Sequence, residues 1–414
     1  MTDIDTAIVG AGLAGLACAT HLEAAGISAA IFEASDGVGG RVRSDVVDGF
    51  TLDRGFQILL TSYPELIRLG LLDDLNLARF NPGAVVRVNN SFARVGDPFR
   101  QVRTLIPTAV APIGSLSDKL KILRLRRQLT RSDPVQLMKS TQLTTRQELT
   151  RRGFSPKIIE RFFQPLLSGI QLMPDLDGPA AMFLTIMRAL TVGEAAVPSA
   201  GMGALPALLA TRLNSTPIHL NSPVSSLTTT GLRLEDGQTI MARNVVLATD
   251  GPTAAHMAAL PAVGSNVVTA LYFAADQAPL SDKAVVLNGT GKGLVTNMAV
   301  MSNVSPAYAP PGRALIVAAI VASRSADTEQ AARRQLGSWF GNQVDGWETV
   351  AAYEIPHAQP SAGPPFLPTQ PVRLGLGRYV CGDHRDTPSI QGALYSGRRA
   401  AAALIADRVT SVAS

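Results

Sequence analysis

The sequence predicts an α/β fold, and three observations lead to this prediction. Asp5 to Val9 and Ser28 to Phe32 are short apolar runs, and Leu13 to Ala25 between them has apolar residues at helical spacing. The first run and the helix are joined by Gly10-Ala-Gly-Leu-Ala-Gly15, and Gly26 ends the helix. The chain has 414 residues, which is more than one compact core usually holds. We therefore expect one Rossmann-type domain that begins with this β-α-β unit, and a second, α+β domain.

The glycine turn has the spacing of a dinucleotide-binding site. Gly10 permits the tight turn, Gly12 lets the backbone approach a pyrophosphate, and Gly15 lets the helix pack closely on the strand. The N-terminus of the helix offers free N–H groups to the phosphates. Glu33 ends the second strand, and we expect its carboxylate to accept hydrogen bonds from both hydroxyls of an adenosine ribose. Because a carboxylate repels a 2′-phosphate, the pattern disfavours NADP.

A second glycine cluster, Gly37-Val-Gly-Gly-Arg41, follows the acid directly. The order GxGxxG, Glu, Gly-Gly-Arg resembles the start of the flavin amine oxidase superfamily, which includes amine oxidases, protoporphyrinogen oxidases, and carotenoid desaturases and isomerases. The resemblance implies FAD, with Gly39 and Gly40 close to its pyrophosphate and ribityl chain. Because no histidine or cysteine sits in a context that matches covalent flavin attachment, we expect the FAD to be non-covalent. Arg41 would add positive charge there, although a surface salt bridge is the alternative.

Phe50-Thr-Leu-Asp-Arg-Gly-Phe-Gln57 is similar to the segment of this superfamily that runs under the isoalloxazine. Gly55 would be the point of close approach. Asp53 either has a function there or caps a turn.

Two segments near the C-terminus are similar to the same superfamily. Arg378 to Asp383 is predicted to be a short strand that ends at Gly-Asp, and a helix is expected to start at Ser389 and to reach about Asp407. The resemblance implies that Asp383 bonds to the ribityl or pyrophosphate region. It also implies that the backbone of Gln391 and Gly392 faces the flavin pyrimidine, where a helix dipole stabilises the charge of the reduced flavin.

A third patch lies between these ends. Ser199 to Leu209 resembles the glycine-rich start of a helix in the superfamily, and Ile218 to Val224 is predicted to be a strand whose last residue bonds adenine through its backbone. Leu232 to Leu247 is a predicted hairpin with Glu235-Asp-Gly237 as its turn. The residues expected at the FAD are Gly10, Gly12, Leu13, Ala14, Gly15, Glu33, Ala34, Gly39, Gly40, Arg41, Gly55, Phe56, Val224, Gly382, Asp383, Ile390, Gln391 and Gly392.

The three matching patches suggest how the domains divide. We expect residues 1–79, 196–254 and 366–414 to form the FAD-binding domain, and residues 80–195 and 255–365 to form the substrate domain.

The superfamily chemistry is hydride removal from a C–H bond to flavin N5, with reoxidation by oxygen or a quinone. Amine oxidases usually carry an aromatic residue where this chain has Ser389, and no lysine clearly matches the one they place near N5; Lys283 and Lys292 are expected on the surface. These departures favour an apolar substrate such as an isoprenoid or polyene. The alternatives are an amine oxidase with an altered cage, and a flavin protein with an isomerase or a non-catalytic role.

Histidines and cysteines suggest no further chemistry. His357 and His384 are expected to be hydrogen-bonded structural histidines, no metal site is expected, and no residue is assigned a catalytic role. Only two cysteines occur, Cys18 and Cys381, which fits a reducing cytoplasm, and the N-terminus lacks the basic region of a signal peptide.

The charge pattern bears on partners. The formal net charge is +5, but nucleic-acid binding is not expected, because lysine clusters with interleaved aromatics are missing. Residues 117–131 have a helical pattern with six basic residues and one acid. This segment predicts either a solvated helix face or contact with an anionic membrane.

Overall fold

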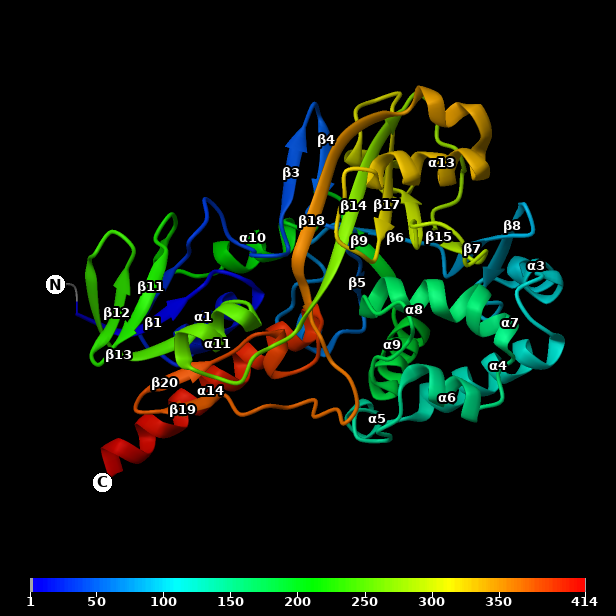
Figure 1. Cartoon of the computed structure of the whole chain (residues 1–414). Helices are drawn as coiled ribbons and strands as arrows, with labels where there is room; N and C mark the ends of the chain where they lie inside the picture. The colour runs from blue at the N-terminus through cyan, green and yellow to red at the C-terminus, as the bar shows by residue number, and fades with distance from the viewer. Residues whose placement is uncertain (1–2, 414) are drawn as a thin grey trace.

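The computed structural model describes residues 3–413, which contain two large β-sheets (Figure 1). The first is a mixed sheet in which β1 lies parallel to both β2 and β13, and β20 is parallel to β13. Its strand order is β10-β2-β1-β13-β12-β11, with β20 and β19 attached to β13. The bounds are β1 Asp3–Val9, β2 Ala29–Phe32, β10 Ile218–His219, β11 Val224–Thr228, β12 Gly231–Leu234, β13 Thr239–Leu247, β19 Arg373–Gly375 and β20 Arg378–Val380.

The β-α-β unit and the hairpin predicted from the sequence are present in this sheet. Helix α1 (Leu13–Ala24) follows β1, and β12 and β13 are joined through a turn at Glu235–Gly237. The strand predicted over Ile218–Val224 is present only at Ile218–His219, as β10. Asn221 adopts a left-handed conformation (φ 51°), and the loop before β11 is held by Glu33 and Ser35, whose carbonyls accept from the amides of Ser222 and Asn221.

The second sheet has the order β18-β14-β17-β16-β15-β7-β8. It is antiparallel except for the β15–β7 pair, and its two longest strands, β14 and β18, extend toward the first sheet (Figure 1). Its central strands β14 and β17 are buried along most of their length. The bounds are β7 Gly83–Val88, β8 Ser91–Gly96, β14 Ser265–Ala275, β15 Val285–Asn288, β16 Asn297–Val300, β17 Ala314–Ile320 and β18 Glu348–Pro360.

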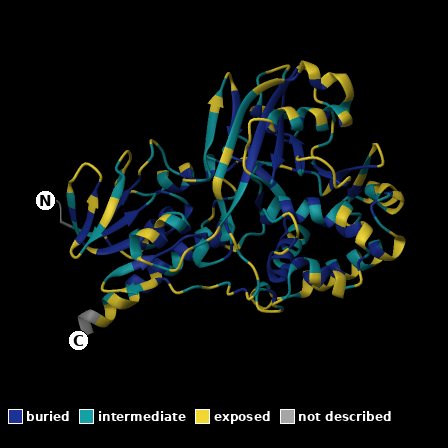
Figure 2. Cartoon of the chain, in the orientation of Figure 1, coloured by how far each residue is buried: buried dark blue, intermediate teal, exposed yellow. Residues whose placement is uncertain are grey.

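A layer of helices follows β8 and packs beside the second sheet (Figure 1). Its apolar core includes residues of β7, α8 and α9, and Figure 2 shows the helices buried on their inner side and exposed on their outer side. The bounds are η1 Val102–Thr104, α3 Leu105–Val110, α4 Leu116–Arg131, α5 Pro134–Leu137, α6 Thr145–Arg151, α7 Pro156–Ile158, η2 Ile159–Phe163, α8 Gln164–Gln171 and α9 Ala180–Val192. Within residues 3–413, no helix combines the length and the apolar character needed to cross a bilayer.

The smaller elements connect these layers. They are β3 Ser44–Val47, β4 Phe50–Asp53, β5 Leu59–Leu60, α2 Pro64–Arg68, β6 Leu77–Arg79, β9 Ala195–Pro198, α10 Ala204–Thr211, α11 Gly251–Ala258, α12 Met301–Val304, η3 Pro306–Tyr308, α13 Thr328–Phe340, η4 Gly341–Gly346, η5 Asp383–Arg385 and α14 Ile390–Ala413.

Helix α14 packs directly on α1, so the last helix of the chain lies against the first. The contact is close because a Cβ atom at Gly397 would overlap the carbonyl oxygen of Ala14. The helix predicted to end near Asp407 continues to Ala413.

The buried carboxylate of Asp53 links the β3–β4 hairpin to Met202, just before α10, and to Tyr308 in η3. It accepts hydrogen bonds from Ser44 Oγ (2.6 Å), the Met202 amide (2.8 Å) and Tyr308 Oη (2.8 Å). Tyr272 Oη of β14 donates to the Asp53 carbonyl (2.8 Å). Of the two roles left open for Asp53, the geometry therefore supports a structural one. Burial raises the pKa of this carboxyl to about 6.

We expect Gly397→Ala to destabilise the protein by about 1–3 kcal/mol, because the added methyl group must push α14 away from α1. Gly337→Ala is the matched control, since this glycine also lies inside a helix but has open space around its Cβ position. That control should be neutral or stabilising by up to about 1 kcal/mol. Thermal unfolding of both variants checks the prediction, and equal midpoints would contradict it.

Asp53 should make the stability depend on pH. Because its pKa in the folded state lies above the ordinary value, protonated Asp53 stabilises the fold, and this contribution is lost as the pH rises through about 6. Asp53→Asn carries no such titration. The free energy of unfolding of the wild type should therefore fall relative to that of Asp53→Asn by about 2–3 kcal/mol between roughly pH 4 and 7. Denaturant titrations at several pH values measure this difference, and a constant difference is the contrary result.

Candidate functional site

A cavity of about 1600 Å³ extends from the carboxyl ends of β1 and β2 into the helical layer. Of the eighteen residues predicted to contact the FAD, fifteen line this cavity. They are Gly10, Gly12, Leu13, Ala14, Glu33, Ala34, Gly39, Gly40, Arg41, Gly55, Phe56, Val224, Gly382, Asp383 and Ile390. Segments from both ends and the middle of the sequence are thus brought to one wall.

The first glycine turn leaves room for a ligand. Gly10 has φ +105°, and a Cβ atom there would lie 2.9 Å from the carbonyl oxygen of Ala248, so the fold itself requires a glycine. Gly12 differs, because it has an ordinary φ of −71° and a Cβ atom there would meet nothing within 4 Å. Nothing in the described chain explains a glycine at this position, whereas a pyrophosphate against the bare backbone does. No side chain caps α1 at Gly12, so the first amides of the helix face this space.

Glu33 is held in place at the end of β2. Its Oε2 accepts from the Ala11 amide (2.7 Å), and its Oε1 accepts from the amide and the hydroxyl of Ser35 (2.9 and 2.6 Å). Each carboxylate oxygen can accept further hydrogen bonds, and Glu33 lines the cavity next to Val224. This arrangement suits the ribose hydroxyls of an adenosine.

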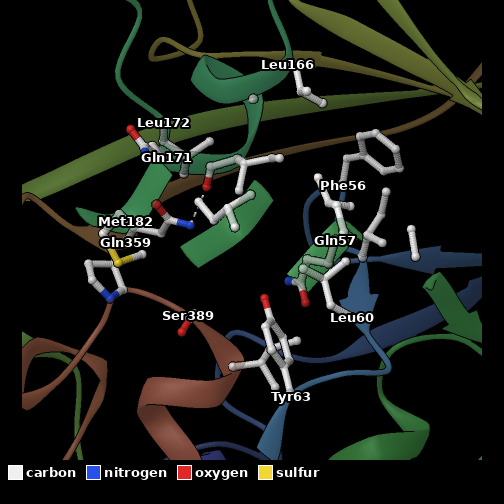
Figure 3. Close-up of a pocket in the computed structure, with 18 of the residues that line it drawn as sticks. Phe56, Gln57, Leu60, Tyr63, Leu166, Gln171, Leu172, Met182, Gln359 and Ser389 are labelled. Atoms are coloured by element: carbon white, nitrogen blue, oxygen red, sulfur yellow. Dashed lines mark hydrogen bonds between the residues drawn. The ribbon is translucent and has the colours of Figure 1, made fainter. Parts of the chain in front are cut away.

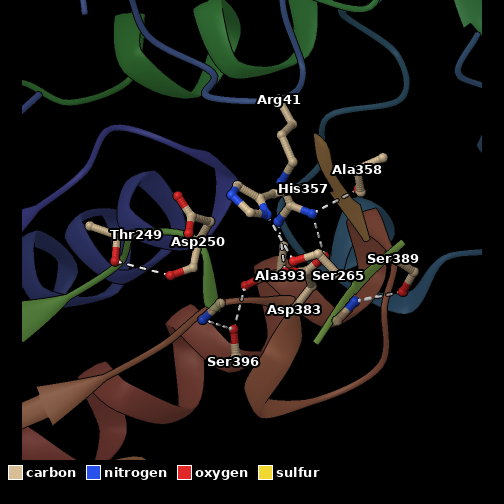
Figure 4. A network of polar contacts seen from close by, with 12 residues as sticks. Arg41, Thr249, Asp250, Ser265, His357, Ala358, Asp383, Ser389, Ala393 and Ser396 are labelled. Carbon is tan, nitrogen blue, oxygen red and sulfur yellow. Dashed lines mark hydrogen bonds and ion pairs between the residues drawn. The ribbon is translucent and has the colours of Figure 1, made fainter. Parts of the chain in front are cut away.

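Arg41 and Asp383 form a two-contact ion pair on the cavity wall (Figure 4). The guanidinium nitrogens lie 2.9 and 2.7 Å from the Asp383 oxygens, and Arg41 also donates to the Ala358 carbonyl (2.9 Å). The pair joins residues 342 positions apart. Both partners line the cavity, so the ion pair is part of the cavity wall, and Asp383 balances the charge of Arg41. Contact of Arg41 with FAD stays a prediction.

Three predicted residues lie behind the wall. Gly15 packs under the turn, where a Cβ atom would overlap the Gly10 carbonyl oxygen. The Gln391 side chain accepts from the Glu65 amide (2.9 Å), and the Gly392 amide donates to Ser389 Oγ (3.0 Å). The amide of Gly392 is therefore already used by the chain. Ser389, at the position of the missing aromatic residue, caps the start of α14 with its hydroxyl.

The two histidines differ from each other. His357 Nδ1 lies 2.8 Å from Ser265 Oγ, which confirms the structural role expected for it. His384 is half-buried, and desolvation of its ring lowers the pKa of the imidazole to about 4. Both ring nitrogens are buried and have no partner within residues 3–413, so the hydrogen bond expected for His384 is absent. Lys283 and Lys292 are exposed and do not line the cavity, as expected.

Sequence analysis missed the polar groups of the central cavity (Figure 3). Gln57 Nε2 donates to the carbonyls of Arg41 (2.7 Å) and Arg54 (3.0 Å), while its buried Oε1 has no partner in the described chain. Gln171 presents the opposite group, since its buried Nε2 has no partner there. Gln57 ends a motif segment and could have been noticed. Gln171 lies in α8, which has no motif.

We expect Gly12→Ala to fold normally and to lose most of its affinity for FAD. The methyl group meets no atom of the described chain, so the unfolding midpoint of the apoprotein should change by less than the equivalent of about 1 kcal/mol. It occupies the space for the pyrophosphate, so the dissociation constant for FAD should rise at least about tenfold. Quenching of flavin fluorescence on titration measures this constant. Gly346→Ala, which also meets nothing, is the control, and unchanged FAD affinity in Gly12→Ala would refute the assignment.

Comparison with known proteins agrees with this geometry. The family model "Flavin containing amine oxidoreductase" matches residues 13–405. Protoporphyrinogen oxidase 2 of Arabidopsis thaliana is 28% identical over 163 residues, which are 39% of this chain and 32% of that protein. Putrescine oxidase of Kocuria rosea is 46% identical over 76 residues, which are 18% of this chain and 16% of that enzyme. The match thus spans a third or less of the length of these relatives.

Solved structures show the same fold over nearly the whole chain. An oxidoreductase from Methanosarcina mazei has a TM-score of 0.74 at 17% identity, covering 96% of this chain and 99% of its own. Cyclohexylamine oxidase from Brevibacterium oxydans has a TM-score of 0.65 at 18% identity, covering 98% and 99%. The family resemblance and the α/β fold predicted from the motifs are confirmed. The chain therefore belongs to the flavin containing amine oxidoreductase family, and its cofactor is FAD.

Proposed function

We propose that the protein is an FAD-dependent oxidoreductase that acts on a largely apolar, uncharged substrate, such as an isoprenoid or polyene. The observation that supports this proposal is the distribution of charge in the cavity. Its central part is lined by aliphatic, aromatic and methionine side chains, among them Leu60, Leu166, Leu172 and Met182 (Figure 3). The charged lining residues fall into three groups: those of the predicted FAD site and the segments beside it, those of the segment 97–126, and Glu194, which forms an exposed ion pair with Arg79. The first group is Glu33, Arg41, Arg54, Glu235, Asp250 and Asp383.

An alkylammonium substrate would find little to bind it in this central part. A buried cation needs a carboxylate or a set of aromatic faces. Apart from these charged groups, the only titratable side chain that lines the cavity within residues 3–413 is Tyr63, and burial raises its pKa to about 12. Ser389 stands where an aromatic wall would be. These features favour a neutral substrate over an amine.

Gln57 and Gln171 would position that substrate. A buried amide group without a partner costs about 1–3 kcal/mol, which a ligand group of the right kind recovers. The unpartnered Oε1 of Gln57 accepts hydrogen bonds, and the unpartnered Nε2 of Gln171 donates them. A hydroxyl or carbonyl on an otherwise apolar chain would satisfy one of these groups.

Bound FAD supplies the acceptor, at N5, for a hydride from a substrate C–H bond, and oxygen or a quinone would reoxidise it. The chain contributes orientation and exclusion of water. The apolar lining excludes water from the reacting bond, and the amides hold the substrate along the cavity.

Anaerobic reduction of the holoenzyme, followed by the visible absorbance of the flavin, tests the proposal. A neutral polyene in detergent micelles should bleach the flavin at least about tenfold faster than a primary alkylamine of similar length. The reason is that binding the alkylammonium requires burial of a charge, whereas binding the polyene does not. Faster bleaching by the amine would indicate an amine oxidase. Altered polyene isomers without bleaching would indicate an isomerase, and no change with either compound would sink the proposal.

A substitution at Gln171 tests the contribution of its side-chain amide to binding, separately from that of the apolar lining. Gln171→Leu should weaken binding of a hydroxylated polyene by roughly two- to tenfold, since one hydrogen bond is lost. Binding of the matching hydrocarbon, measured by the same fluorescence titration, should stay unchanged and serves as the control.

A further inference from the structure

We propose that residues 99–131 form a docking surface for an anionic phospholipid bilayer, and that the cavity opens onto it. The docking surface comprises the exposed side chains of η1, α3 and α4 together with Phe99. Eight of the seventeen large apolar side chains that are exposed in the described chain lie within residues 99–123. Single exposed apolar residues are ordinary on protein surfaces, but such a concentration marks an interaction site.

Helix α4 has an apolar face that the fold does not use. Its inner face is buried through Leu125 and Leu129. On the opposite side Leu116, Leu120 and Leu123, spaced four and three residues apart, are 67%, 50% and 36% exposed. A helix on the surface of a protein in water needs only the inner apolar face. The second face therefore weighs against the solvated helix that the sequence left as an alternative.

The preceding segment shows the same property more strongly. Neither η1 nor α3 buries any residue, although α3 consists largely of apolar residues. Val102, Ile106 and Val110 are 77%, 73% and 74% exposed. Figure 1 shows α3 and α4 at the same end of the molecule, far from both chain termini. A short helix that buries nothing within the chain gains little from folding unless another phase covers it.

The positive charge of the docking surface indicates that its partner is anionic. Residues 99–131 contain eight basic residues and one acid, Asp118, which is buried in the capping box of α4. The side chains of Arg103, Arg124, Arg127 and Arg131 are exposed and form no ion pair or hydrogen bond with any described residue. Apolar side chains flanked by free arginines match the acyl chains and the phosphate groups of an anionic bilayer.

A second copy of the chain is a poorer occupant. A symmetric dimer places the same patch on both subunits, so the arginines of one copy would face those of the other. An anionic bilayer has the complementary charge.

The docking surface continues into the cavity. Leu105, Leu116, Leu120 and Leu123 are exposed and also line the cavity. Lys119 lines it too, and its Nζ donates to the carbonyls of Ala109 and Ala111, which ties α4 to the end of α3 at this opening. A molecule dissolved in the bilayer could therefore enter without crossing water. This entry route rests on the proposed function, whereas the docking itself does not.

Co-sedimentation of the FAD-loaded protein with vesicles tests the docking, without any substrate. Binding to phosphatidylcholine vesicles that contain phosphatidylglycerol should exceed binding to pure phosphatidylcholine vesicles at least about tenfold and should weaken with salt. Leu116→Ser/Leu120→Ser and Arg124→Ser/Arg127→Ser should each lower the vesicle affinity about tenfold or more.

Matched controls lie elsewhere on the surface. Leu367→Ser/Leu376→Ser removes two exposed leucines, and Arg233→Ser/Arg334→Ser removes two exposed arginines, so both should bind vesicles like the wild type. Circular dichroism and FAD content confirm that every variant is folded. Equal binding by the docking-surface variants and their controls would overturn the proposal. Detection of a wild-type dimer by light scattering that is absent in Leu116→Ser/Leu120→Ser would also overturn the proposal. Flavin reduction in detergent is read separately, so failure of the docking and failure of the proposed function remain distinguishable.

Discussion

The close contact between α1 and α14 is the constraint on which the rest of the site depends. Gly397 lets the two backbones approach, and this brings the start and the end of the chain together. Only then can Arg41 reach Asp383 and complete the cavity wall that begins at the glycine turn. In the first sheet, β13 from the middle of the sequence pairs with β1 and with β20. The sheet therefore also brings the end of β13 to the same cavity wall.

Local patterns were sufficient for elements whose cause is local. The glycine turn and Gly26 bracket α1 to within one residue, and Glu235-Asp-Gly237 is a turn that allows few alternatives. The strand predicted over Ile218–Val224 ends at His219, because the amides of Asn221 and Ser222 donate to the carbonyls of Ser35 and Glu33, which follow β2. The accepting carbonyls belong to residues almost two hundred positions away, so the sequence of the segment itself does not indicate these hydrogen bonds.

The substrate side of the cavity was least accessible from sequence for the same reason. Gln171 is an ordinary helical glutamine until the fold places it in a cavity and leaves its Nε2 without a partner. Asp53 shows the converse, since a conspicuous acid in a motif segment turns out to join Ser44, Met202 and Tyr308 in a buried network. Two of the three groups that bond to the Asp53 carboxylate, the Met202 amide and Tyr308 Oη, lie 149 and 255 positions away. The motif residues were easier to predict, because fifteen of the eighteen residues expected at the FAD line one cavity.

The hydroxyl of Ser389 couples two properties that are usually independent. It caps α14 through the Gly392 amide and, being small, leaves the adjoining part of the cavity open. A bulky ring at this position would narrow the cavity and at the same time remove the cap from the helix that anchors the C-terminus. Reshaping the cavity at this position would thus need a second replacement, elsewhere at the start of α14, that restores the cap.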